Sequence, residues 1–158
     1  MKKKKLDLLD LDILTLLKEN SKISFRELAK QLNVATQTVQ TRIQHMQNDG
    51  VIKGNYISLD YEKLGYGLTV VTEVTVSKGK LDITEREIAK ISEACAVYDT
   101  TGLTDAIVIA KFKNREDLGV FTKKLLAMPY VERTNTHVVL AIHKENFNLP
   151  LQIEVQED

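Results

Sequence analysis

Apolar positions recur at helical spacing near the start of the chain. Ile13 and Leu16 lie three positions apart and belong to a stripe that begins at Leu9. Asp7 or Asp10, just before or within the first turn, can accept the free N–H groups of a helix start. The pattern therefore predicts a first helix that ends near residue 20.

A second helix is predicted by a capping box. Ser24 and Glu27 have the spacing at which each side chain bonds the other residue's backbone N–H. Ile23 and Leu28 stand where a hydrophobic staple would fix the start of the helix. We expect this helix to run to about Leu32.

A third helix follows after a short break at residues 33–34. Val39, Ile43 and Met46 form its apolar stripe, and Gly50 can end it in a left-handed conformation. Three helices, two of them closely joined, are typical of a helix-turn-helix.

Beyond residue 50 the periodicity changes from helical to alternating. Residues 51–60 are short, mixed and extended, as in a wing or a linking strand, and Gly65 and Gly67 mark a boundary. The following elements are then expected: a strand Leu68–Ser77, a helix capped by Thr84 and Glu87 that carries Ile83, Ile88, Ile91 and Ala94, strands Cys95–Thr101 and Ala106–Lys113 joined by a turn, a helix between Asn114 and Pro129, and a strand Val131–His143.

The order βαββαβ is that of the split ferredoxin-like unit. The predicted fold class is α+β, with an N-terminal (winged) helix-turn-helix domain at residues 1–54, a linker strand at 55–66 and a C-terminal ferredoxin-like domain at 67–158.

Several predicted strands are apolar on both faces. Val70 stands beside Val71, and residues 107–109 and 138–142 are almost continuously apolar. Two helices cover one face of such a sheet, so a second subunit's sheet is expected to cover the other. We therefore predict at least a homodimer.

The predicted third helix is polar but uncharged opposite its apolar stripe. Amide side chains can pair with the major-groove edge of adenine, and threonine can bond a base or contact the methyl group of thymine. The helix pattern alone fits a solvated surface equally well. In helix-turn-helix proteins the start of this helix meets the bases. The candidate base-contacting residues are Thr36, Gln37, Thr38, Gln40, Thr41 and Gln44, and Asn48 completes the polar face.

Basic residues around the three helices are candidates for contacts with DNA phosphates. Arg42 lies at the flank of the third helix, where its head can reach a phosphate or a neighbouring carboxylate; we favour the phosphate. The other candidates are Lys2 to Lys5, Lys22, Arg26, Lys30 and Lys53. The lysine run at residues 2–5 is also typical of a solubilising tail.

The overall charge hides a difference between the two halves of the chain. Lys+Arg and Asp+Glu number 22 each, but residues 1–60 hold ten basic and seven acidic side chains and residues 61–158 hold 12 and 15. A basic first domain and an acidic second one are expected when only the first meets a polyanion.

Composition narrows the class of protein further. A hydrophobic content of 43% supports real cores, and Asp7, Asp10 and Asp12 interrupt the only stretch that mimics a signal peptide. The single cysteine, Cys95, excludes an internal disulfide and is expected in the core. We expect a cytoplasmic protein without a membrane segment.

No motif for catalysis is apparent. His45, His137 and His143 show no metal-ligand spacing with Cys95, and neither a nucleophile motif nor a phosphate-binding glycine loop is present. His137 and His143 share a strand face, where interface histidines are a better interpretation than a metal site. We predict no enzyme activity, no metal and no cofactor.

The chain resembles the leucine-responsive/asparagine regulator (Lrp/AsnC) family of transcription factors from about Leu6 to Lys144. The resemblance is carried by Leu6-Asp7 with Asp10 and Ile13-Leu14, by Ile23-Ser24, Leu28-Ala29 and Leu32, by the run from Asp49 to Gly54, by Leu64-Gly65, by Thr101-Gly102 with Asp105, and by Val131 to Thr134 with Thr136.

This resemblance implies an N-terminal DNA reader and a C-terminal amino-acid-sensing domain. It also implies dimers that assemble into tetramers or octamers with small effectors between dimers, and two reading helices of a dimer fit a pseudopalindromic operator. The matching effector positions are Gly102, Leu103, Thr104, Asp105, Thr134 and Thr136.

The residues alone leave two alternatives open. Gly102 to Asp105 can be a plain hairpin turn with Thr134 and Thr136 as ordinary strand residues. The family often has an acidic and an aromatic residue where Leu103 and Thr104 stand, so the effector is not identified. The chain can also be an architectural protein that coats DNA with little sequence preference.

Overall fold

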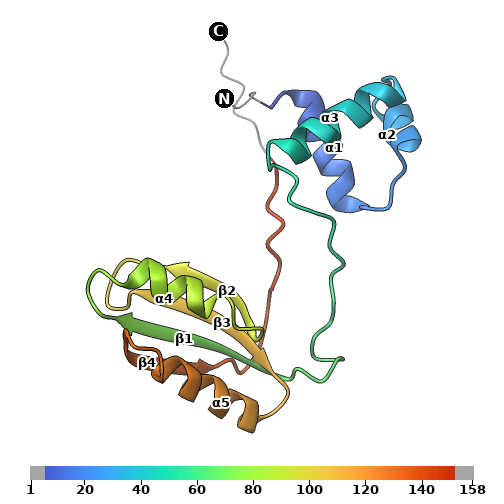
Figure 1. Cartoon of the computed structure of the whole chain (residues 1–158). Helices are drawn as coiled ribbons and strands as arrows, with labels where there is room; N and C mark the ends of the chain where they lie inside the picture. Colours follow the sequence, from blue (N-terminus) through green and yellow to red (C-terminus); the bar gives the residue numbers. More distant parts are fainter. Residues whose placement is uncertain (1–5, 152–158) are drawn as a thin grey trace. The chain divides into compact units, whose positions relative to one another are not determined.

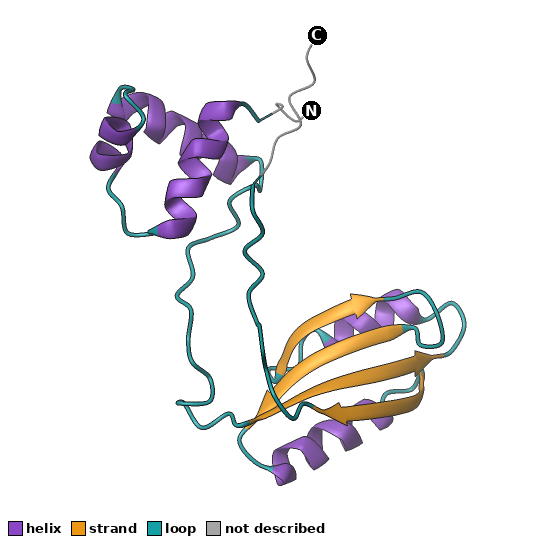
Figure 2. Cartoon of the chain, turned by 180° about the vertical axis from the view of Figure 1, so that it is seen from behind, coloured by secondary structure: helices purple, strands orange, loops and turns teal. Residues whose placement is uncertain are grey.

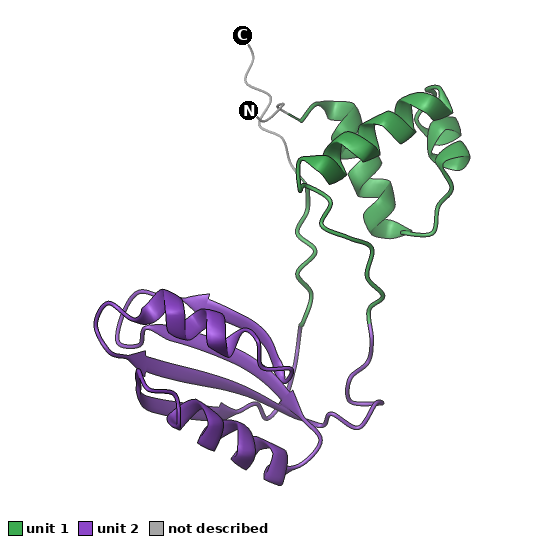
Figure 3. Cartoon of the chain, viewed as in Figure 1, with its two compact units in different colours: residues 1–58, 145–158 green, residues 59–144 purple. Residues whose placement is uncertain are grey.

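A computed structural model of the chain describes residues 6–151. They form two compact units, one of residues 6–58 and 145–151 and one of residues 59–144 (Figure 3). Each unit has its own hydrophobic core and is described by itself below.

The first unit contains the three predicted helices, α1 (Leu8–Glu19), α2 (Phe25–Gln31) and α3 (Thr36–Asn48) (Figure 1). Both aspartates at the start of α1 take part in a capping box. The backbone N–H of Asp10 donates to Asp7 Oδ1 at 3.0 Å, and that of Asp7 donates to Asp10 Oδ2 at 3.1 Å. Ser24 caps α2 by accepting from the Glu27 N–H at 3.1 Å. The predicted helices are confirmed.

The three helices pack around one apolar cluster. Ile13, Leu28 and Val39, one from each helix, are completely buried at its centre. The turn between α2 and α3 is fixed by Asn33 in a left-handed conformation (φ +53°), and Gly50 (φ +72°) ends α3 in the same way, as predicted. This packing leaves the opposite side of α3 exposed.

The segment that follows α3 differs from the expectation. No strand lies within residues 51–67, so the prediction of a linker strand at residues 55–66 is wrong. Residues 53–60 are extended without a partner strand, and residues 61–65 form a turn. An extended segment becomes a strand only when another backbone pairs with it.

The second unit is an antiparallel sheet with two helices. Its elements are β1 (Leu68–Val76), α4 (Leu81–Ile88), β2 (Ala94–Asp99), β3 (Ala106–Phe112), α5 (Arg115–Leu126) and β4 (Val131–Val138). The strand order is β2-β3-β1-β4, and every neighbouring pair is antiparallel. This order is the one expected of a ferredoxin-like βαββαβ unit, so the predicted fold class is confirmed.

Helix α4 begins one turn earlier than its sequence suggests. Thr84 is buried inside the helix, where its hydroxyl donates to the Lys80 carbonyl at 2.8 Å, and so it is no cap. The chain turns at Gly79 (φ +76°), and Lys80 takes the cap position without a side-chain bond. Threonine can make this backward bond inside a helix as well as cap one, and the sequence pattern does not distinguish the two. Ala94, expected in the helix, begins β2.

Strand β4 is shorter than predicted. It ends at Val138 instead of His143. One more backbone bond follows, in which the Val139 N–H donates to the Thr69 carbonyl at 2.9 Å. Beyond this point the sheet offers no neighbouring strand, because β4 lies at its edge and β1 begins at Leu68.

Both helices of the second unit cover the same face of the sheet, and the strands lie bare on the other side (Figure 2). The covered face holds the core, with Val70, Val74 and Val108 completely buried against Ile88 and Leu125. The opposite side, called the open face here, carries Val71, Glu73, Tyr98, Ile107, Ile109, Asn135 and His137. No helix among residues 6–151 is long and apolar enough to cross a membrane.

Candidate DNA interface and ligand site

The exposed side of α3 is a row of uncharged polar side chains. Thr36, Gln37, Gln40, Thr41 and Gln44 are all exposed, and Thr38 is half-buried. The cluster of Val39, Ile43 and Met46 buries the other side of the same helix. The predicted polar face is therefore directed to solvent.

Hydrogen bonds within this row differ from residue to residue. The Thr41 hydroxyl donates to the Gln37 carbonyl at 2.8 Å, and the Gln44 amide donates to Asn48 at 3.1 Å. The side-chain amides of Gln37 and Gln40 have no hydrogen-bond partner within residues 6–151. These two amides are the ones free to pair with an outside molecule.

The start of α3 has no side-chain cap. Ala35 occupies the cap position, and Thr36, which offered an alternative cap, is the first residue of the helix. Backbone N–H groups at such a start carry a partial positive charge that suits an anion.

Arg42 is held inside its own unit. Its Nη1 lies 2.5 Å from Asp7 Oδ2 and 3.2 Å from both carboxylate oxygens of Asp10, whose side chain is almost completely buried. Burial disfavours the charged form of Asp7, but the Asp10 N–H and the Arg42 guanidinium outweigh this and lower the pKa of Asp7. The structure thus places Arg42 in the ion pair with neighbouring carboxylates, instead of leaving it free for the phosphate contact that its position on the helix flank favoured.

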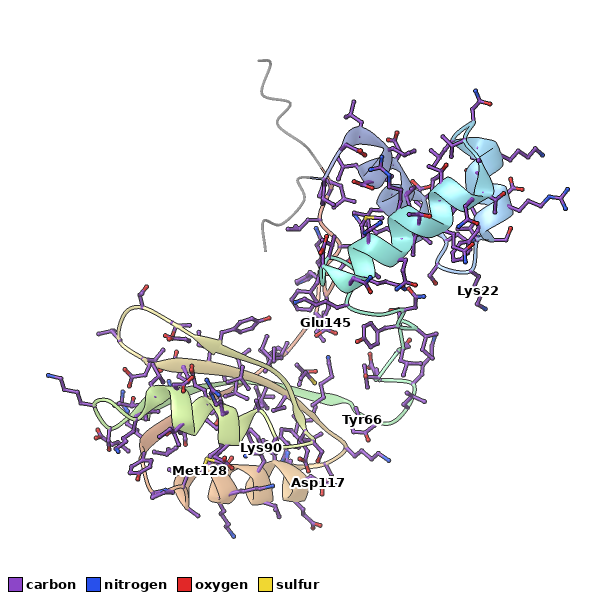
Figure 4. The ribbon with its side chains drawn as sticks, turned by 45° about the horizontal axis from the view of Figure 1, so that its top comes forward. Lys22, Tyr66, Lys90, Asp117, Met128 and Glu145 are labelled. Atoms are coloured by element: carbon purple, nitrogen blue, oxygen red, sulfur yellow. The ribbon has the colours of Figure 1, made fainter. Side chains whose placement is uncertain are left out.

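The remaining basic candidates surround the helices. Lys22, Arg26, Lys30 and Lys53 are exposed, and none of them forms an ion pair within the described residues. Lys22, in the turn between α1 and α2, points away from the helices (Figure 4). The lysines at positions 2–5 lie outside the described residues.

The turn between β2 and β3 is fastened to the end of β1. Asp105 accepts from the Val76 N–H at 2.8 Å, and the Thr104 hydroxyl donates to the Val74 carbonyl at 3.0 Å. Gly102 has a φ of +123°, a conformation that side-chain-bearing residues rarely adopt, and Leu103 is fully exposed.

Thr134 and Thr136 lie on β4, on the helix-covered side of the sheet. Thr134 is opposite Val74 and Thr136 is opposite Thr72, to whose hydroxyl it is bonded at 3.1 Å. The structure therefore brings Thr104, Asp105 and Thr134 to the same end of β1, on either side of that strand.

A polar cluster on the open face was not foreseen. Glu73 on β1 accepts from Asn135 at 3.1 Å and lies 3.3 Å from His137 Nε2, with both partners on β4. The alternation of each strand placed these residues on one face, but only the register shows that they meet. No group of metal-ligating side chains occurs in the described part of the chain.

Cys95 was expected in the core and is exposed instead. The pairing of β2 with β3 shifts between Ala94 and Ala96, and this bulge turns the thiol outward. A bulge leaves no mark in the alternation of apolar residues, so it could not be predicted from the sequence.

Two family models match the chain. The model described as winged helix-turn-helix DNA-binding matches residues 6–53, and the model described as Lrp/AsnC ligand binding domain matches residues 69–149. Together they cover the three helices and the sheet, and residues 54–68 between the two matches belong to neither.

Relatives and solved structures agree with both models. An uncharacterized HTH-type transcriptional regulator of Pyrococcus abyssi is 49% identical over 91% of this chain and 98% of its own length. The HTH-type transcriptional regulator FL11 of Pyrococcus horikoshii is 36% identical over 93% of this chain and 97% of its own length. The structure of AsnC from E. coli superimposes with a TM-score of 0.85 at 25% identity, over 93% of this chain and all of its own.

These relatives are transcriptional regulators and not enzymes, as expected from the residues. One family model matches the three helices and the other matches the ferredoxin-like sheet with its two helices. The protein belongs to the Lrp/AsnC family of DNA-binding transcriptional regulators.

Proposed function

We propose that this regulator reads a specific pseudopalindromic operator in the cytoplasm as a homodimer or a larger assembly of dimers, and that an amino acid changes its assembly or its affinity for DNA. The single observation that carries the proposal is the exposed, uncharged side of α3, where the amides of Gln37 and Gln40 lack partners within the described residues.

The chemistry of this surface favours reading bases over coating phosphates. Charged side chains supply most sequence-independent affinity for DNA, whereas glutamine amides pair with the edge of adenine. Arg42 is bonded to Asp7 and Asp10, which leaves Gln37, Gln40 and Thr41 as the groups that would meet the bases. Lys22, Arg26, Lys30 and Lys53 are the proposed phosphate contacts.

The open face of the sheet supports the proposed dimer. Val71, Ile107 and Ile109 are only half-buried there, and Tyr98 is 44% exposed. A second copy that covered this face would bury apolar surface and place two α3 helices in one assembly. Two half-sites would then be read together, which compensates for the modest positive charge of a single first domain.

The turn of residues 102–105 is the proposed effector site, together with Thr134 and Thr136. The backbone at Gly102 has no side chain in front of it, and a Cβ there would meet no atom within 4 Å. The carboxylate of Asp105 suits an ammonium group, and the threonine hydroxyls suit the polar ends of an amino acid. Residues 69–149 match a ligand-binding domain, which supports a ligand of this kind.

Selection from a random duplex pool tests the proposal. The full chain is mixed with the pool, bound duplexes are recovered and sequenced, and the selection is repeated with each common amino acid present. We expect a symmetric sequence bound roughly a thousandfold more tightly than random duplex, and one amino acid that changes the yield. Equal affinity for all duplexes would contradict specific reading, and no response to any amino acid would contradict the effector.

A further inference from the structure

Thr41 is the short side chain in the middle of the exposed row on α3. Gln37 lies one turn before it and Gln44 one turn after it, while Gln40 is its neighbour in sequence. These three amide side chains are longer than Thr41 and extend beyond it, while its other neighbours one turn away are the half-buried Thr38 and the exposed His45. A short residue in this place leaves room for a group that projects from the partner molecule.

The hydroxyl group of Thr41 is already engaged. It points back along the helix and donates to the Gln37 carbonyl at 2.8 Å, while the residue as a whole remains exposed. Threonine in helices adopts one of two side-chain conformations, and this bond selects between them. The methyl group is the other heavy substituent on Cβ, so the outward contact that Thr41 offers is apolar.

The major groove presents one apolar group, the methyl group of thymine. We propose that Thr41 is a specificity-determining residue that selects thymine by contact between the two methyl groups. The inference rests on the proposed function, since it requires α3 to lie in the major groove. Adenine recognition then falls to the amides of Gln37 and Gln40, which have no partner within residues 6–151, and thymine recognition falls to Thr41 beside them.

Recognition through the hydroxyl is the competing possibility. Thymine offers the hydroxyl only an acceptor, O4, and donation to it would require the bond to Gln37 to break and the side chain to rotate. Contact through the methyl group requires neither change. The first mode depends on the Thr41 hydroxyl, and the second depends on the methyl groups of Thr41 and of thymine. Removing one methyl group at a time therefore distinguishes the two modes.

The experiment uses the duplex obtained by selection and replaces each thymine singly with deoxyuridine, which differs only by lacking the methyl group. We expect the wild type to lose affinity about fourfold at one thymine in each half-site, the factor that follows from burying one methyl group. Thr41→Val keeps a methyl group and should show the same loss. Thr41→Ser lacks it and should bind both duplexes equally, about fourfold more weakly than the wild type binds thymine.

Thr122 provides a matched control. Its hydroxyl makes the same bond within α5, to the Leu118 carbonyl at 3.0 Å, in the unit that carries the sheet. Thr122→Ser should leave the response to deoxyuridine unchanged, and circular dichroism should show that all three variants are folded.

The outcomes separate this inference from the function on which it rests. If Thr41→Ser keeps the preference for thymine, or Thr41→Val loses it, the hydroxyl or another residue reads this base and the inference is wrong. If the selection yields no preferred duplex, specific reading fails and the inference fails with it.

Discussion

At the scale of single residues, position in the helix and the available partner decide what a polar side chain does. Gln40 and Arg42 are two residues apart on α3, yet the amide has no partner within residues 6–151 and the guanidinium is bonded to Asp7 and Asp10. The sequence predicted the free face because periodicity alone determines it. It could not predict the partner of Arg42, because that depends on how α1 packs against α3.

Replacing the amide side chains of Gln37 and Gln40 should weaken binding to the selected duplex more than non-specific binding to random duplex. Gln37→Ala and Gln40→Ala each remove a side chain that can pair with a base, so affinity for the selected duplex should fall by about 1–3 kcal/mol. Affinity for random duplex should change little, and this is measured by titration of both duplexes at one salt concentration. Lys53→Ala is the control, since loss of a phosphate contact lowers both affinities alike. Equal weakening by the glutamine variants would contradict base reading.

Removing the guanidinium of Arg42 should destabilise the first unit. Arg42→Gln leaves the nearly buried carboxylate of Asp10 without its cation, and we expect a loss of about 1–2 kcal/mol, below the value for fully buried pairs because Asp7 is half-exposed. Denaturant unfolding measures the loss. Arg86→Gln is the matched control, because its pair with Asp82 is exposed on α4 and should contribute less than about 0.5 kcal/mol.

The same ion pair predicts a dependence on pH. The pKa of Asp7 is lowered in the folded chain, so its charged form stabilises the fold above the ordinary value of 3.8, and this contribution disappears as the pH falls through the folded pKa. The difference in unfolding free energy between the wild type and Asp7→Asn should therefore be constant near neutral pH and shrink below pH 3.8. A difference that grows in acid would contradict the assignment.

At the scale of elements, caps and periodicity predicted what is local, and pairing decided the rest. The predicted Asn114 cap of α5 is confirmed. It was predictable because asparagine is one of the residues most favoured immediately before a helix. The predicted start of α4 was wrong, because Thr84 can bond either a following N–H or a preceding carbonyl. The predicted end of β4 was wrong, because a strand ends where its neighbouring strand ends. The proposed effector turn at residues 102–105 was suggested by the resemblance alone, and only the fold shows its bonds to β1.

The cap of α5 gives a measurable contribution to stability. Asn114 accepts from the Asp117 N–H at 2.8 Å, so Asn114→Ala should cost about 1 kcal/mol in thermal or denaturant unfolding. Asn55→Ala, in the extended and exposed linker, should cost almost nothing. Similar effects of the two changes would show that the cap does not stabilise α5.

At the scale of the whole molecule, the sheet buries one face under α4 and α5, and no helix of the same unit covers the open face. Glu73, Asn135 and His137 form a polar patch beside the apolar side chains of the open face, so a second copy would meet both kinds of surface. Such a mixture favours one relative orientation of two copies over others.

A charge placed on the open face should prevent assembly. Ile109→Glu would put a carboxylate among the half-buried apolar residues of β3, and we expect sedimentation to show monomers where the wild type is dimeric or larger. Val120→Glu, on α5 and 66% exposed, is the control and should leave the assembly unchanged. Monomeric wild type would contradict the proposed dimer.

The bond between Asp105 and the backbone of Val76 has a consequence for how a ligand would be sensed. A ligand ammonium that drew this carboxylate away would leave the Val76 amide without its acceptor at the end of β1. That amide should then exchange its hydrogen with deuterated solvent faster, so a single backbone position would report occupancy of the turn before any change in assembly is visible.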